Sequence, residues 1–138
     1  MLHVITGDPL TGKSTLVKSH AKNGDVVIDL DEIARALTIT QVSHQYPLHI
    51  RQLAIVARQA VINRVLASNL NNVEVWLIHA DPTNEQMKRY QLKGAVIHKC
   101  TATPAELAER LKTRTPENQA KVKAYYAKKA NKAYAEDY

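Results

Sequence analysis

The stretch Gly7-Asp8-Pro9-Leu10-Thr11-Gly12-Lys13-Ser14-Thr15 decides the fold of this chain. It fits the pattern G-x-x-x-x-G-K-[ST], in which backbone N–H groups and the start of a helix surround phosphate oxygens. The residues before it, Leu2–Thr6, are typical of a short buried strand, and Ser14–Lys22 carry apolar side chains at helical spacing. Strand, loop and helix follow in the order that phosphate binding requires. We therefore expect the whole loop to contact a nucleotide, with Lys13 reaching the β- and γ-phosphates and the Ser14 hydroxyl coordinating Mg²⁺.

Apolar runs alternate with helical segments along the rest of the chain. The sequence predicts further strands at 25–29, 73–78 and 94–98, and helices at 30–38, 50–70, 83–91, 103–115 and 116 onward, with a loop at 39–49. Thr103 and Glu106 have the spacing of a capping box. Because strands alternate with helices, we expect an α/β fold. Its form would be a three-layer sandwich, with a short, mostly parallel sheet and helices on both faces.

Composition restricts the class of protein. The chain has 138 residues, a formal net charge of +6 and one cysteine, Cys100. Its length suits a single domain over residues 1–138. No apolar run approaches the roughly 20 residues of a membrane span, so we expect no membrane partner. The lone cysteine and a first strand that begins at once predict a cytoplasmic protein.

The positive charge is concentrated at the C-terminal end, in a predicted helix over 116–138. Lysines alternate there with tyrosines: Lys121, Lys123, Lys128, Lys129 and Lys132 with Tyr125, Tyr126 and Tyr134. Such a segment can bind single-stranded nucleic acid through charge and stacking. The alternative is a solvated helix face whose tyrosines pack on the domain. The sequence leaves the oligomeric state open.

Carboxylates follow the second and third predicted strands. Ligands of parallel sheets bind beyond the carboxyl ends of the strands. Asp31 is therefore placed to orient or deprotonate an attacking hydroxyl, and Asp81 to hold Mg²⁺ directly or through water. Two alternatives stay open: Asp29 or Asp31 caps the following helix, and Asp81 belongs to an Asp-Pro turn. We expect His79 to be packed or hydrogen-bonded rather than catalytic.

Arginines are the remaining candidates for catalysis. Arg110 and Arg114 are four residues apart, and we expect them on one helix face, followed by a mobile segment that ends at Pro116. Guanidinium groups stabilise the charge on a phosphoryl group in transfer. The alternative is a solvated face paired with Glu106 and Glu109. Weaker candidates, for an acceptor pocket, are Arg35, Arg51, Arg58, His44 and His49.

Four segments together resemble the P-loop kinase group, in particular polynucleotide 5′-kinases and zeta-toxin-like kinases. They are VITGDPLTGKST at 4–15, VVIDLDEIAR at 26–35, VWLIHADPTNEQ at 75–86 and AELAERLKTR at 105–114. With RTPENQAKVKAYY at 114–126 included, the chain is more similar to small bacteriophage proteins described only as AAA-family ATPases or kinases.

The resemblance implies ATP and Mg²⁺ as cofactors. It assigns phosphate binding to Lys13, Mg²⁺ coordination to Ser14 and proton removal from the acceptor to Asp31. Asp81 resembles the acid that follows the third strand in these kinases, and Arg110 and Arg114 resemble lid arginines.

The chain also departs from this group. Leu10 stands where such loops have a small residue. No separate lid domain fits into the chain, and it lacks the sensor region of a hexameric AAA motor. The acceptor's identity does not transfer, because residues 39–60 contain no recognisable motif.

The sequence thus predicts an ATP-binding phosphotransferase that acts on a nucleotide, nucleoside or polynucleotide 5′ acceptor. Two alternatives stay open. One is a partner- or DNA-stimulated ATPase in phage DNA handling, and the other is a nucleic-acid-binding module with a degenerate nucleotide site. If phage-encoded, the protein would act in the bacterial host cytoplasm.

Overall fold

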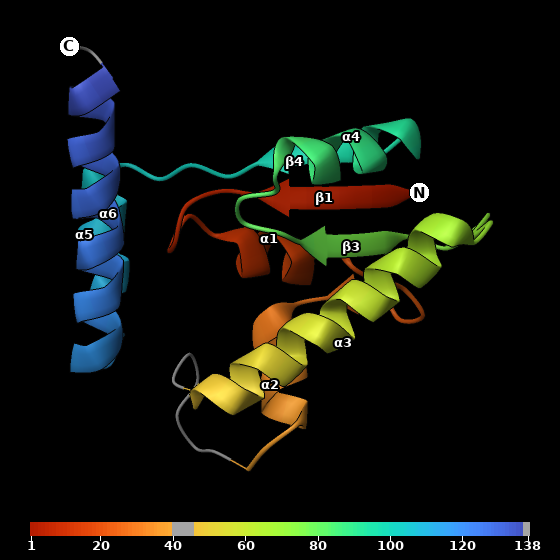
Figure 1. Ribbon diagram of the computed structural model, residues 1–138, viewed down its shortest axis with the longest axis horizontal. Coiled ribbons are helices and arrows are strands. Elements are labelled where there is room, and N and C mark those ends of the chain that lie inside the picture. The colour runs from red at the N-terminus through yellow and green to blue at the C-terminus, as the bar shows by residue number, and fades with distance from the viewer. Residues whose placement is uncertain (40–45, 137–138) are drawn as a thin grey trace. The chain divides into compact units, whose positions relative to one another are not determined.

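The computed structural model describes residues 1–39 and 46–136, with side chains as far as Ala130 (Figure 1). Strands and helices alternate as predicted, with ends that differ by a few residues. In chain order they are β1 (Leu2–Thr6), α1 (Lys13–His20), β2 (Val26–Ile28), α2 (Leu30–Ala36), α3 (Leu48–Ala67), β3 (Val75–Ile78), α4 (Asn84–Leu92), β4 (Val96–Lys99), α5 (Pro104–Leu111) and α6 (Pro116–Glu136). Most of the predicted loop at 39–49 lies outside the described residues.

The strands form one parallel sheet in the order β2-β3-β1-β4. The central strands β1 and β3 have the sequences LHVIT and VWLI, which are almost wholly apolar. Central parallel strands are buried on both faces, so this composition is what the position requires. The predicted α/β class with a P-loop type sandwich is confirmed.

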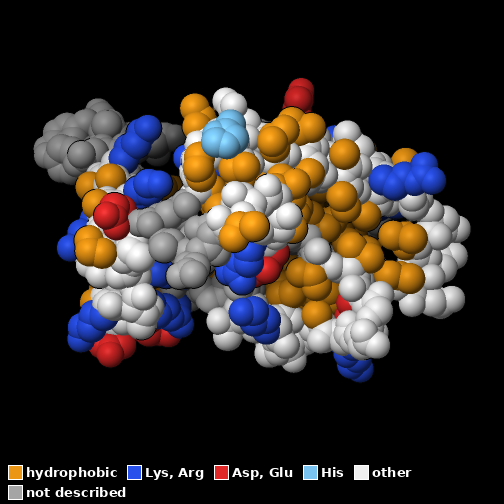
Figure 2. Space-filling model, turned by 90° about the horizontal axis from the view of Figure 1, so that it is seen from below, with side chains coloured by type: hydrophobic (Ala, Val, Ile, Leu, Met, Phe, Trp, Pro, Cys, Tyr) orange, Lys and Arg blue, Asp and Glu red, His pale blue; other side chains and the backbone are white. Residues whose placement is uncertain are grey.

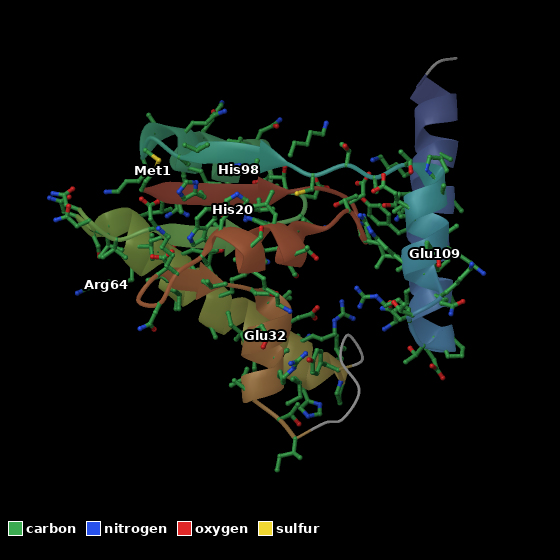
Figure 3. All side chains as sticks on the ribbon, turned by 180° about the vertical axis from the view of Figure 1, so that it is seen from behind. Met1, His20, Glu32, Arg64, His98 and Glu109 are labelled. Carbon is green, nitrogen blue, oxygen red and sulfur yellow. The ribbon has the colours of Figure 1, made fainter. Side chains whose placement is uncertain are left out.

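The sheet carries helices on both faces because the chain reverses its direction across it. It crosses one way from β1 to β2 and the other way from β2 to β3 and β4, and right-handed crossovers then place the helices on opposite faces. The α3–α4 face has the larger core, formed by Leu2, Val4, Ile28, Ile62, Val75, Leu77 and Tyr90. The opposite face packs on α1 through Ile5, Val17 and Trp76. Figure 1 looks onto α3, and Figure 3, from behind, looks onto α1.

Histidines join three strands on the α1 face. The His3 ring stacks on Trp76 with centroids 4.0 Å apart. Its Nδ1 lies 3.0 Å from Nε2 of His98 on β4, and its Nε2 lies 2.6 Å from Oε2 of Glu74. Figure 3 labels His98 on β4 and His20 on α1, which lie on this side of the sheet. A polar, aromatic network thus covers the part of this face that α1 leaves open.

Helices α2 and α3 pack on each other through Ala34, Ile50 and Ala54. The outer side of α3 is also apolar, with Leu53 and Val56 exposed. Figure 2, which views the molecule from the α2–α3 side, shows hydrophobic side chains gathered among arginine and lysine. α3 therefore buries only one of its apolar sides.

The chain divides into two compact units, Met1–Thr101 and Ala102–Tyr138. The first holds the sheet and α1 to α4. The second is formed by α5 and α6, and α5 begins with the predicted capping box between Thr103 and Glu106. The assignment of residues 1–138 to a single domain stays a prediction. In the described part of the chain, no helix is both long and apolar enough to cross a membrane.

Candidate nucleotide site

The loop between β1 and α1 has a backbone conformation that ordinary residues avoid. φ is +145° at Gly7, +63° at Leu10 and +93° at Gly12. A Cβ at Gly7 would lie 2.6 Å from the Cys100 carbonyl oxygen and 2.7 Å from Oγ1 of Thr11, so only glycine fits there. The left-handed conformation of Leu10 costs about 1–2 kcal/mol, and such strain is typical of ligand-binding loops.

Two side chains hold the loop closed from within. The Thr11 hydroxyl donates to the Asp8 carbonyl oxygen at 2.7 Å. Lys13 Nζ donates to the carbonyl oxygens of Gly7 at 2.8 Å and Asp8 at 2.6 Å. Burial lowers the pKa of the Lys13 ammonium, while nearby acidic groups, Cys100 first, act in the opposite direction. Lys13 is thus hydrogen-bonded to the first two residues of the loop in which it would contact phosphate.

The start of α1 is open to an anion. Gly12 is its N-cap, and neither a capping side chain nor an acidic residue occupies its first turn. Ser14 and Thr15 are exposed. The free N–H groups and the positive end of the helix dipole therefore favour phosphate. The Ser14 hydroxyl fits Mg²⁺ bound between protein and phosphate, because this ion uses few protein ligands and keeps several waters.

The carboxyl end of β3 lies against the loop. The Gly7 N–H donates to the Ala80 carbonyl oxygen at 3.1 Å, and the His79 N–H donates to that of Ile5 at 3.0 Å. Asp81 follows and is exposed. Within residues 1–39 and 46–130, no three His, Cys, Asp or Glu side chains gather as a metal site. Asp81 could thus supply only one ligand beside phosphates and waters, and its metal role stays a prediction.

Asp29 and Asp31 occupy different positions at the start of α2. Asp29 is the N-cap, and its Oδ1 accepts from the Asp31 N–H at 3.0 Å. The capping alternative is therefore confirmed for Asp29. Burial lowers the pKa of Lys13, and the charge of Asp29 acts against this larger effect. Asp31 lies in the first turn, half-buried, and its carbonyl oxygen accepts from the Tyr46 hydroxyl at 3.3 Å. A base role for Asp31 stays a prediction.

The expectation that His79 is packed or hydrogen-bonded is confirmed, but its partner at this sheet edge was not predicted. His79 is 7% exposed, and its Nδ1 lies 2.9 Å from the hydroxyl of Tyr90 on α4. Burial, then the charge of Arg58, lower the pKa of His79 to about 4, against the effect of Asp81. The imidazole is therefore neutral at pH 7. No local sequence pattern indicates this pair, because His79 follows β3 and Tyr90 lies on α4.

The expected arginine pair does not share a helix face. Arg110 lies on α5 and forms an ion pair with Glu106 at 3.3 Å. α5 ends at Leu111, so Arg114 lies in the turn before α6, and the prediction of a common face is wrong. The Thr113 hydroxyl donates to the Arg110 carbonyl oxygen at 2.8 Å and so satisfies a group at the end of the helix. Lid roles for Arg110 and Arg114 stay predictions.

The weaker acceptor candidates are dispersed. Arg35 is exposed and lies 3.6 Å from Glu32, one turn away on α2. Arg51 and His49 are exposed near the start of α3, and His44 lies outside the described residues.

Comparison with known proteins gives one family. The family model described as AAA domain matches residues 2–135, which include the phosphate loop, both strand-end acids and most of the second unit. No curated protein matches the chain.

Proposed function

The chain belongs to the AAA domain family and is a P-loop nucleotide-binding protein of the NTPase and kinase type, and we propose that it is an ATP-dependent phosphotransferase. It transfers the γ-phosphoryl group to a hydroxyl of a nucleotide, nucleoside or polynucleotide 5′ acceptor.

The phosphate loop carries this proposal. Lys13 is hydrogen-bonded to the start of the loop, and α1 offers an uncapped amino end. Asp29, the N-cap of α2, is near enough for its charge to act on Lys13, and the proposed base Asp31 follows in the first turn of the same helix. Phosphoryl transfer needs mainly such positioning and charge stabilisation, with little covalent participation of the protein.

In the proposed step, the acceptor oxygen forms a bond to the γ-phosphorus. The bond from that phosphorus to the β–γ bridging oxygen breaks, and ADP leaves with its electron pair. The hydroxyl proton passes to the Asp31 carboxylate. Lys13 and the loop N–H groups stabilise charge on the phosphate oxygens. Mg²⁺, bound at Ser14 and assisted by Asp81, would supply further charge neutralisation.

The test is transfer of label from γ-labelled ATP in the presence of Mg²⁺. The acceptors are nucleosides, nucleoside monophosphates, 5′-hydroxyl DNA and RNA oligomers and sugar nucleotides. We expect label on one acceptor class and a loss of about 10²–10³-fold in Lys13→Ala, because one charge-stabilising donor is removed. Lys18→Ala is the matched control, since Lys18 is an exposed lysine of the same helix. Label released only as free phosphate would favour an ATPase instead.

Substitution of each aspartate in turn distinguishes the roles of Asp29 and Asp31. Asp31→Asn should lower kcat strongly at an unchanged ATP affinity, because it removes the base and leaves the loop intact. Asp29→Asn keeps a capping side chain and should lower activity less. The reverse order would assign the base to Asp29.

A further inference from the structure

Arg58 stands on the inner side of α3, which is an unusual place for a guanidinium group. It lies four residues after Ala54 and four before Ile62, and residues so spaced share a helix side. Ala54 is 0% exposed against α2, and Ile62 is 2% exposed in the core on the sheet. Arg58 therefore lies where α3 passes from α2 onto the sheet.

Arg58 is half-buried, and one nitrogen of its guanidinium group lacks a partner among the described residues. Its Nε atom is buried and has no hydrogen-bond partner. Nor does any Asp or Glu side chain in the described residues form an ion pair with Arg58. Buried donors normally find partners, and an orphan in a folded protein calls for an explanation. For a permanently charged group the natural partner is an anion.

Two groups near Arg58 are neutral. Its charge acts on His79 and on Tyr90, so the guanidinium lies near this hydrogen-bonded pair. Burial keeps both rings uncharged at pH 7, lowering the pKa of His79 and raising that of Tyr90. The acid whose charge acts on His79 is Asp81, which is exposed. Nothing in this set neutralises Arg58.

The same place borders the phosphate loop. His79 is followed by Ala80, whose carbonyl oxygen accepts the Gly7 N–H at 3.1 Å. α2, on which the first half of α3 packs, begins with Asp29 and the proposed base Asp31. Arg58 thus lies at the carboxyl edge of the sheet, on the side where the acceptor's hydroxyl would be.

We propose that Arg58 binds an anionic group of the acceptor, a phosphate or a carboxylate, beside the hydroxyl that is phosphorylated. This inference rests on the proposed function. It restricts the acceptor to molecules that already carry negative charge, and it predicts poor use of a bare nucleoside. Arg58 is then a specificity-determining residue, and the neutral pair of His79 and Tyr90 leaves its charge available to the ligand.

The first experiment compares matched acceptors that differ in one anionic group. A nucleoside, its 3′-monophosphate, a 5′-hydroxyl oligonucleotide and a small hydroxy acid are phosphorylated by the wild type, Arg58→Gln, Arg58→Lys and Arg64→Gln. Arg64 is an exposed arginine of the same helix and serves as the matched control.

We expect Arg58→Gln to raise the KM for the preferred anionic acceptor by about ten- to a hundredfold, as expected for loss of a hydrogen bond to a charged group. The KM for ATP and the slow use of the nucleoside should not change. Arg58→Lys should restore part of the affinity, because it keeps the charge but not the planar fork. The anionic acceptor with the lowest KM shows whether Arg58 binds a phosphate or a carboxylate. An equal loss on charged and neutral acceptors, or efficient wild-type use of the nucleoside, would overturn the inference.

A second measurement needs no turnover. Inorganic phosphate and acetate are titrated into ¹⁵N-labelled protein holding a non-hydrolysable ATP analogue, and the arginine Nε–H signals are recorded. The signal missing from Arg58→Lys should shift with one of the anions, and that of Arg64 should not. A shift without transfer to any acceptor would reject the kinase function but keep the anion site. An unmoved Arg58 signal would reject the anion site whatever the protein catalyses.

Discussion

The residues at the carboxyl ends of the parallel strands differ in backbone conformation and hydrogen bonding from those at the amino ends. At the carboxyl ends, the loop passes through positive φ at Gly7, Leu10 and Gly12, and the Arg58 Nε atom is buried without a partner. At the amino ends, backbone pairs continue the sheet, as where the Val75 N–H donates to the Met1 carbonyl oxygen at 2.9 Å. The strained leucine of the loop and the unpartnered Nε atom thus lie at the carboxyl edge, while the sheet itself supplies stability.

The amino ends border an open hollow of about 760 Å³ between the turn at 68–73 and Leu92. The turn contains Asn72 with a φ of +68°, a conformation that asparagine adopts more readily than leucine does. A hollow therefore also occurs at the edge away from the phosphate loop, and the backbone conformation together with the buried Nε atom of Arg58 supports our proposal that nucleotide binds at the carboxyl edge.

The largest effect should come from the middle of the sheet. Leu77 on β3 is 1% exposed in the main core, so Leu77→Ala should lower the free energy of unfolding by about 2–5 kcal/mol. Lys13→Ala should change it by less than about 1 kcal/mol, because Lys13 is only half-buried and its hydrogen bonds close a loop. Urea unfolding and binding of a fluorescent ATP analogue measure the two quantities. The comparison fails if Lys13→Ala unfolds as readily as Leu77→Ala.

The second-largest expected effect is a dependence of folding stability on pH that is caused by His79. Its pKa is about 4 in the folded protein, while an unfolded histidine titrates near 6.5. Between these values the unfolded chain binds more protons, so the folded state loses stability as the pH falls from 6.5 to 4, by up to about 3 kcal/mol. Above pH 6.5 the imidazole is neutral in both states and contributes nothing to the slope.

His79→Gln should remove most of that slope in urea unfolding between pH 7 and 4.5. His98, whose pKa is also lowered, leaves a weaker dependence of the same sign. His49→Gln, at an exposed position, should keep the wild-type slope. A wild-type slope in His79→Gln would show that other groups carry the pH dependence.

The sequence predicted the features that depend on residues close together along the chain. The phosphate loop was found because glycine, lysine and hydroxyl residues stand at fixed spacings, and the Thr103–Glu106 capping box for the same reason. Where α5 stops was not predicted: the Thr113 hydroxyl bonds to the helix end, so Arg114 lies in a turn. The nearness of Arg58, His79 and Tyr90 was not predictable either, because they come from three elements that only the folded chain brings together.

The smallest effect on stability should come from Leu10→Gly. Glycine relieves about 1–2 kcal/mol of left-handed strain, but the unfolded chain gains freedom worth about 0.4–1 kcal/mol, so stability should rise by no more than about 1.6 kcal/mol. Nucleotide affinity should fall severalfold, because a glycine loop samples more conformations before it binds. Asn72→Gly has a similar native φ at the other edge and should leave the affinity for an ATP analogue unchanged. If both variants weaken binding equally, or neither does, the strain at Leu10 is no part of the binding site. If only Leu10→Gly weakens binding, the strain at Leu10 is part of a loop whose conformation suits phosphate before the nucleotide binds.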